Sequence, residues 1–162
     1  MQTHSKIVYS ALVSAFVLAS VSSPAQAQTL VDAANPNAIL NIAKGYGAAT
    51  LTKDSVGDPY ISGMIEGTRY GVYFYGCTSG RNCKEIQLRA SWDTRNISLG
   101  AINLWNQKNR FGHAYLYDSD SHPSLDIMVN LNYGVSSRNL EDTFDTWRVV
   151  MNKFKLNVID KG

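Results

Sequence analysis

The two cysteines of this 162-residue chain are the pair whose spacing most clearly suggests chemistry. Cys77 and Cys83 flank the polar stretch 78–82, and the segments on both sides alternate apolar and polar residues as β-strands do. A zinc site is disfavoured because no histidine lies near either cysteine, and a redox-active pair usually has the spacing C-x-x-C at a helix start. We therefore predict a structural disulfide between Cys77 and Cys83, which requires an oxidising compartment.

Residues suited to catalysis are few in this chain. His113 is expected to begin a strand, and His122 to lie in a turn before Pro123. A pair of His113 with Asp118 or Asp126 stays open as an acid–base site, although no motif requires it. The chain has no Gly-x-Ser-x-Gly elbow, no His-Glu-x-x-His and no glycine-rich phosphate loop. We predict no catalytic residue and no cofactor.

Two acidic turns, at 57–59 and 118–120, have the oxygen ligands that calcium prefers. Such acidic turns are far more often simply solvated. We therefore predict no metal site.

The N-terminal residues 1–27 have the organisation of a signal peptide. Lys6 is the single charged residue before an apolar run at 7–21, and Ala25-Gln26-Ala27 has the small-x-small pattern of a signal-peptidase site. The run is shorter than the roughly 20 residues that span a bilayer. We predict cleavage after Ala27, a periplasmic or secreted protein, and no membrane span in the mature chain.

The mature chain is long enough for one domain with a core of its own. Fourteen of the 15 basic residues and all 13 acidic residues follow Ala27, so its net charge is +1. The basic residues are scattered rather than gathered into a stripe, which argues against nucleic acid as a partner. We expect a flexible leader over 28–35 and one domain over 36–160.

Hydrophobic periodicity predicts an α+β fold. Helices are expected after Asn35, after Ser98, and after Ser136 or Ser137, and the last has an apolar stripe at Leu140, Phe144, Trp147, Met151, Phe154 and Val158. Strands are expected near 49–53, 61–66, 70–76, 84–92, 113–118 and 125–133. An antiparallel sheet with one apolar face needs a cover, so we predict a single antiparallel β-sheet of five to six strands with about three helices packed on one face.

The register of the middle strands can be predicted as well. A type II′ turn at Gly67-Thr68 pairs Ile65 with Tyr70, and an opposed Cys77 and Cys83 pair Val72 with Leu88. Both registers place the same residues of the central strand on the apolar face.

The other face of these strands is then polar and aromatic, and the same register places Cys77 and Cys83 on it. It carries Tyr73, Tyr75, Gln87 and Arg89 as a candidate partner-binding face, because Tyr and Arg dominate many binding surfaces. The alternatives are ordinary cross-strand pairs on a solvated sheet, or a face covered by another part of the chain.

Several segments of this chain resemble the YbjN domain family. They are residues 67–77, 101–106 and 110–116, together with the closing helix at 140–154. The likeness runs from about Asn37 to Val158, and its most specific part is Trp105-Asn106 followed by the segment that starts at Arg110. The resemblance implies a fold like that of type III secretion chaperones and a role in sensory transduction, and it carries no catalytic motif.

Two functions therefore stay open for this chain. The first is an exported, non-catalytic binding or chaperone-like module that uses its outer sheet face, or the surface of a homodimer, to hold a protein partner. The alternative is a small periplasmic enzyme with a His/carboxylate acid–base site assembled by the fold. A His–carboxylate pair in a pocket favours the enzyme, whereas an open aromatic face favours the binding module.

Overall fold

The computed structural model describes residues 30–117 and 122–161. The predicted signal peptide, its cleavage site and the acidic segment 118–120 lie outside the described residues. The described residues form three helices, a six-stranded sheet and a small two-stranded sheet.

The helices begin at the polar residues that their sequences predicted. Asn35, Ser98 and Ser136 are the N-caps, and each side chain accepts a hydrogen bond from a backbone N–H of the first turn. The helices are α1 (Pro36–Lys44), α2 (Leu99–Lys108) and α3 (Ser137–Asn157), which the short 3₁₀ helix η1 (Ile159–Lys161) follows. Among the described helices, none is both long and apolar enough to cross a bilayer.

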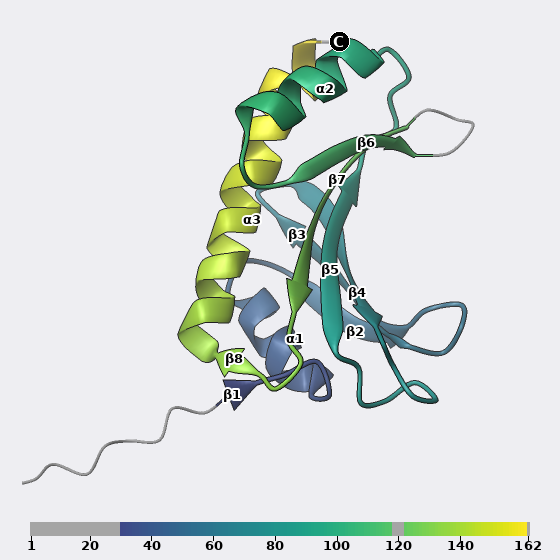
Figure 1. Ribbon diagram of the computed structural model, residues 1–162, viewed down its shortest axis with the longest axis vertical. Coiled ribbons are helices and arrows are strands. Elements are labelled where there is room, and N and C mark those ends of the chain that lie inside the picture. The colour runs from purple at the N-terminus through teal and green to yellow at the C-terminus, as the bar shows by residue number, and fades with distance from the viewer. Residues whose placement is uncertain (1–29, 118–121, 162) are drawn as a thin grey trace, which may run out of the picture.

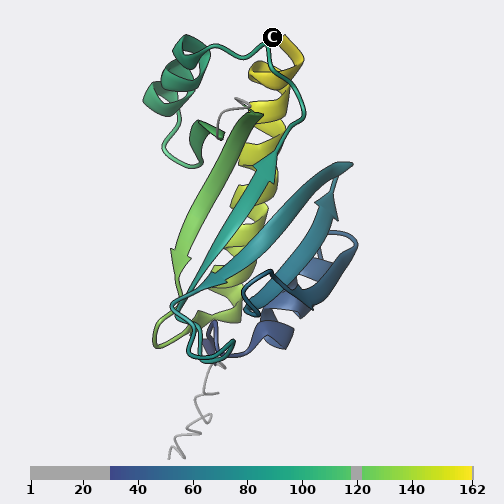
Figure 2. The same ribbon diagram turned by 90° about the vertical axis from the view of Figure 1, so that its right-hand side faces the viewer.

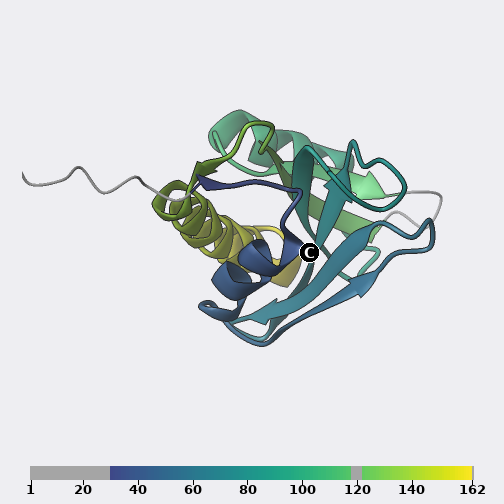
Figure 3. The same cartoon turned by 90° about the horizontal axis from the view of Figure 1, so that it is seen from below.

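The six-stranded sheet is antiparallel throughout, with the strand order β2-β3-β4-β5-β7-β6. Its strands are β2 (Ala49–Lys53), β3 (Pro59–Ile65), β4 (Thr68–Tyr75), β5 (Glu85–Ser91), β6 (His113–Tyr117) and β7 (His122–Asn130). In Figure 1, α3 runs beside the sheet over the length of the molecule, with α1 near its start and α2 near its end. Seen from below, the sheet curves around α3 and α1 (Figure 3). The predicted α+β class, one antiparallel sheet with helices on one face, is confirmed.

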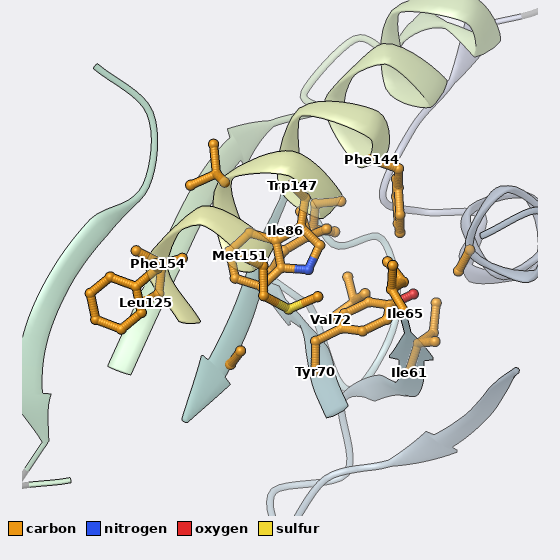
Figure 4. Packing of buried hydrophobic residues seen from close by; sticks show 14 of the residues in the cluster. Ile61, Ile65, Tyr70, Val72, Ile86, Leu125, Phe144, Trp147, Met151 and Phe154 are labelled. Atoms are coloured by element: carbon orange, nitrogen blue, oxygen red, sulfur yellow. The ribbon is translucent and has the colours of Figure 1, made fainter. Parts of the chain in front are cut away.

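The core lies between α3 and the concave face of the sheet. Trp147, Phe144 and Phe154 are fully buried, and Figure 4 shows these side chains of α3 directed toward those of the strands. From the sheet, Val72, Phe74, Ile86 and Leu88 complete this core. The predicted stripe of α3 is buried along its whole length.

The turn between β3 and β4 differs from the prediction by two residues in register. Ile65 pairs with Thr68, not with Tyr70, and the turn residues are Glu66 and Gly67. Their φ angles of 49° and 79° are both positive, as in a type I′ turn, whose backbone twist matches that of the flanking strands. A shift by two residues keeps every side chain on its face, so the hydrophobic pattern alone could not exclude it.

Two further expectations are wrong in part. Residues 30–35 were expected in a flexible leader, yet β1 (Leu30–Val31) pairs with β8 (Val135–Ser136), and Ala33 is fully buried. His122 was expected in a turn, but it begins β7 and pairs with Tyr117. The first difference depends on pairing between segments more than 100 residues apart, which a local pattern does not encode.

Truncation of the central α3 side chains tests this architecture. Phe144→Ala or Trp147→Ala should each lower the free energy of unfolding by about 3–5 kcal/mol, because each leaves a large cavity under the helix. Leu156→Ala, on the same helix but 54% exposed, is the control and should change it far less. Chemical denaturation measures all three variants, and melting of the two aromatic variants within a degree or two of the parent would contradict the packing.

Tyr70 provides a test by pH. Its hydroxyl is buried, no described residue hydrogen-bonds to it, and burial raises the pKa of Tyr70 to about 12. In the unfolded chain the Tyr70 hydroxyl loses its proton near pH 10, before it does so in the folded chain. The free energy of unfolding is therefore at its full value below pH 10 and falls as the pH rises toward 12. This loss should amount to about 2–3 kcal/mol.

Tyr70→Phe should therefore flatten the alkaline fall in stability while leaving the stability at pH 7 nearly unchanged, because the removed hydroxyl has no partner. Tyr133→Phe, at a side chain that is 90% exposed, is the matched control. Denaturation at several pH values checks this, and an equally steep fall in the Tyr70→Phe variant would contradict it.

Candidate functional site

Cys77 and Cys83 are joined by a disulfide in the structure. Between them the chain makes a tight turn in which the backbones of Thr78 and Arg81 exchange two hydrogen bonds. Ser79 and Gly80 at its centre have φ angles of 51° and 71°. The polar stretch 78–82 is thus a small loop that the disulfide closes at its base.

The disulfide does not lie on the polar outer face, where the sequence placed it. Cys83 is buried in the core, and Cys77 packs against the same core. The paired register ends at Tyr75 and Glu85. Beyond it the Lys84 N–H donates to the Tyr75 carbonyl, and Gly76, which lies against Lys84, has a φ angle of 64°. The regular alternation of strand side chains therefore ends before Cys83, which points inward. The disulfide therefore anchors this loop to the core.

The four candidate residues of the sheet do share one face. The register of β4 with β5 is the predicted one, with Val72 opposite Leu88 and Phe74 opposite Ile86. Tyr73, Tyr75, Gln87 and Arg89 therefore lie on the side away from the helices. In Figure 2, no described helix lies in front of these strands. We call this side the outer face.

Arg89 is at the centre of the outer face. Its guanidinium carbon lies 4.1 Å from the ring centroid of Tyr73 and 5.4 Å from that of Tyr117. The Tyr73 ring also contacts Tyr60 on β3, at 4.9 Å between centroids. A guanidinium over aromatic rings is a favourable cation–π arrangement, and it holds the long arginine side chain in one orientation.

A chain of polar contacts crosses the same face. The Tyr75 hydroxyl donates to Gln87 Oε1 at 3.0 Å, and Gln87 Nε2 donates to Asp126 Oδ2 at 2.8 Å. Asp126 Oδ1 lies 3.6 Å from His113 Nδ1, and the His113 ring stacks on Tyr115. The outer face thus carries one connected aromatic and polar network from β3 to β6.

Burial affects the ionisation of several groups in this network. It raises the pKa of Tyr75, and together with the charge of Asp126 it raises the pKa of Tyr115. Burial alone would lower the pKa of Arg89, but contacts with the Tyr73 and Tyr115 hydroxyls outweigh it, so the pKa is raised. At neutral pH the face therefore presents a fixed positive charge among protonated tyrosine hydroxyls.

The fold brings together one of the two histidine–carboxylate pairs that the sequence left open. His113 and Asp126 are cross-strand partners, whereas Asp118 lies outside the described residues. The pair is not enclosed, since the His113 side chain is 68% exposed. His122 lies apart from it, with Nε2 at 3.4 Å from Asp93 Oδ1 without hydrogen-bond geometry.

A cavity of about 330 Å³ opens on the outer face between Tyr60, Tyr73 and Arg89, and neither His113 nor Asp126 lines it. Within the described ranges, no group of three or more His, Cys, Asp or Glu side chains is placed to hold a metal ion. The arrangement on this face suits recognition by stacking and hydrogen bonding.

Sequence reasoning missed Tyr60, Tyr115 and Tyr117 as members of this network, and it named Asp126 only as a possible partner of His113. The alternation within 113–117 was visible, and it places Tyr115 and Tyr117 on the same side of a strand. The alternation does not show which strand lies next to 113–117 in the sheet. The strand β7 lies between β5 and β6, and α2 and β6 separate β5 from β7 along the chain.

Comparison with known protein families identifies the domain. The model of the YbjN family, described as "Putative bacterial sensory transduction regulator", matches residues 35–159. The chain belongs to the YbjN family. No curated protein and no solved structure gives a significant match.

The YbjN match includes every described residue of the outer face and both cysteines. It extends from the N-cap of α1 to the first residue of η1, so the sheet and all three helices belong to the YbjN domain. The resemblance to this family seen in the sequence is confirmed.

The disulfide of this YbjN domain can be tested by alkylation. Protein purified without reductant should add no alkylating groups at Cys77 or Cys83, and two after reduction, by mass spectrometry. Replacing both cysteines with Ala should lower the free energy of unfolding by about 2–3 kcal/mol, because the loop then gains entropy in the unfolded chain. Two alkylated thiols in the unreduced protein would contradict the pairing.

Proposed function

We propose that this YbjN-family chain is an exported, non-catalytic binding module that holds a protein partner on its outer face. Export is supported by the signal-peptide pattern of residues 1–27 and by the Cys77–Cys83 disulfide, which is stable in an oxidising compartment. The resulting location is the periplasm or the exterior of the cell.

The observation that carries this proposal is the position of Arg89 between the rings of Tyr73 and Tyr117 on a sheet face without a helix. Tyr and Arg bury a large area on binding and keep a polar group available for hydrogen bonds. Their side chains are already held by contacts with one another, so a partner loses little entropy in ordering them.

The partner that fits this face best is a protein segment with acidic and aromatic side chains. A carboxylate can pair with the Arg89 guanidinium, and an aromatic ring can stack beside Tyr60 or Tyr73. A second copy of this chain is the other occupant, and measuring the mass of the purified protein in solution separates the two.

An enzyme is the alternative function, and the 3.6 Å approach of His113 to Asp126 is the observation that favours it. The pair is open to solvent and lies outside the cavity of the outer face, so nothing there excludes water or encloses a substrate. We therefore favour binding over catalysis.

A double substitution tests the proposed face. Tyr73→Ala with Arg89→Ala should abolish recovery of the partner in affinity capture from the periplasm, because it removes the stacked cation and its main ring. The melting temperature should stay nearly unchanged, since both side chains lie outside the core.

The matched control is Tyr133→Ala with Arg138→Ala, which removes the same residue types from exposed positions outside the outer face. It should capture the partner as the parent does. Undiminished capture by the Tyr73/Arg89 variant would show that the outer face does not bind the partner. Unfolding of this variant would show that the two side chains are needed for the fold.

A further inference from the structure

A second cavity lies on the helix side of the molecule, away from the outer face. It has a volume of about 380 Å³ and opens between α2 and the last turns of α3 with η1, the region at the top of Figure 1. Its floor is apolar and includes Leu104, Trp105 and Val158, and its rim carries Lys108, Lys153 and Lys161. This volume is within the range of small-molecule sites.

Contacts with neighbouring residues hold Trp105 in place in the floor of this cavity. The Trp105 indole N–H donates to the Gly112 carbonyl at 3.0 Å, and the ring packs edge-on against Phe154 at 5.0 Å between centroids. Leu104, one residue before Trp105, is 49% exposed. An apolar surface is therefore held open to water beside a buried tryptophan, and covering it would be favourable.

The rim of the cavity is positively charged. Lys153 Nζ lies 6.0 Å from the Trp105 ring centroid, and Lys161 Nζ donates to the Asn157 side chain at 3.3 Å. None of the described residues that line the cavity is acidic. Lys155 lies on the same helix as Lys153 but does not belong to the rim. Its ammonium pairs with Asp160 at 2.8 Å, outside the cavity.

We propose that this cavity binds a single-chain anionic amphiphile, with its acyl chain along the Leu104–Trp105 floor and its anionic headgroup among the lysines of the rim. The combination of an apolar floor with a cationic rim fits a ligand that has both parts, and neither a neutral lipid nor a small inorganic anion uses both. The proposal is independent of the partner on the outer face, since the two sites lie on opposite sides of the sheet.

Titration calorimetry with octanoate, decanoate and dodecanoate below their micelle concentrations tests this. Each added CH₂ should raise the affinity about two- to fourfold, as expected for partly buried methylenes. Decyl phosphate distinguishes a phosphate from a carboxylate headgroup. Decyltrimethylammonium, with the same chain and the opposite charge, should bind at least tenfold more weakly than decanoate.

Lys108→Gln with Lys153→Gln should weaken decanoate binding about tenfold and reduce its salt dependence, since two of the three rim charges are lost. Lys44→Gln with Lys84→Gln is the matched control, because Lys44 also lies in the last turn of a helix but away from the cavity. The side-chain N–H resonance of Trp105 should shift with decanoate in the parent, which locates the ligand.

Three results would overturn the proposal: no binding heat and no Trp105 shift, equal affinity for the cationic amphiphile, or parent-like affinity in the Lys108/Lys153 variant. The last would mean that these lysines only complement the carbonyl ends of α2 and α3.

Discussion

The burial of the apolar stripe of α3 against the concave face of the sheet is the interaction on which the rest of the structure depends. Trp147 and Phe144 fill the centre of this contact, and Phe154 extends it to the ring of Trp105 on α2. A single antiparallel sheet cannot bury one face on its own, so without α3 the apolar sides of β3, β4 and β5 would be exposed to water.

The same packing leaves the two sides of the sheet different. Because the helices cover one side, the alternation along each strand places all the aromatic and polar residues of the network on the other. Arg89 is fixed there by neighbouring rings, while the disulfide holds the β4–β5 loop to the core at one end of these strands. An outer face whose side chains are held by one another suits the proposed binding of a partner.

Local patterns predicted much of this structure, and pairing between distant segments explains the rest. The α3 stripe and the β4–β5 register followed from periodicity, and so did the shared face of Tyr73 and Arg89. The β3–β4 register did not, because two glycine-containing turns satisfy the same hydrophobic pattern. The inward position of Cys83 depends on where the regular pairing ends, at Tyr75 and Glu85, and the network of Arg89 with Tyr117 depends on the strand order; periodicity encodes neither.

Hydroxyl-radical footprinting of the protein with and without its captured partner tests the central claim most directly. If the outer face is the binding surface, Tyr73, Tyr75 and Tyr117 should become protected, while Tyr133, which is 90% exposed, should react equally in both samples. Protection confined to Leu104 and other residues of α2 and α3, with the outer-face tyrosines unchanged, would contradict it.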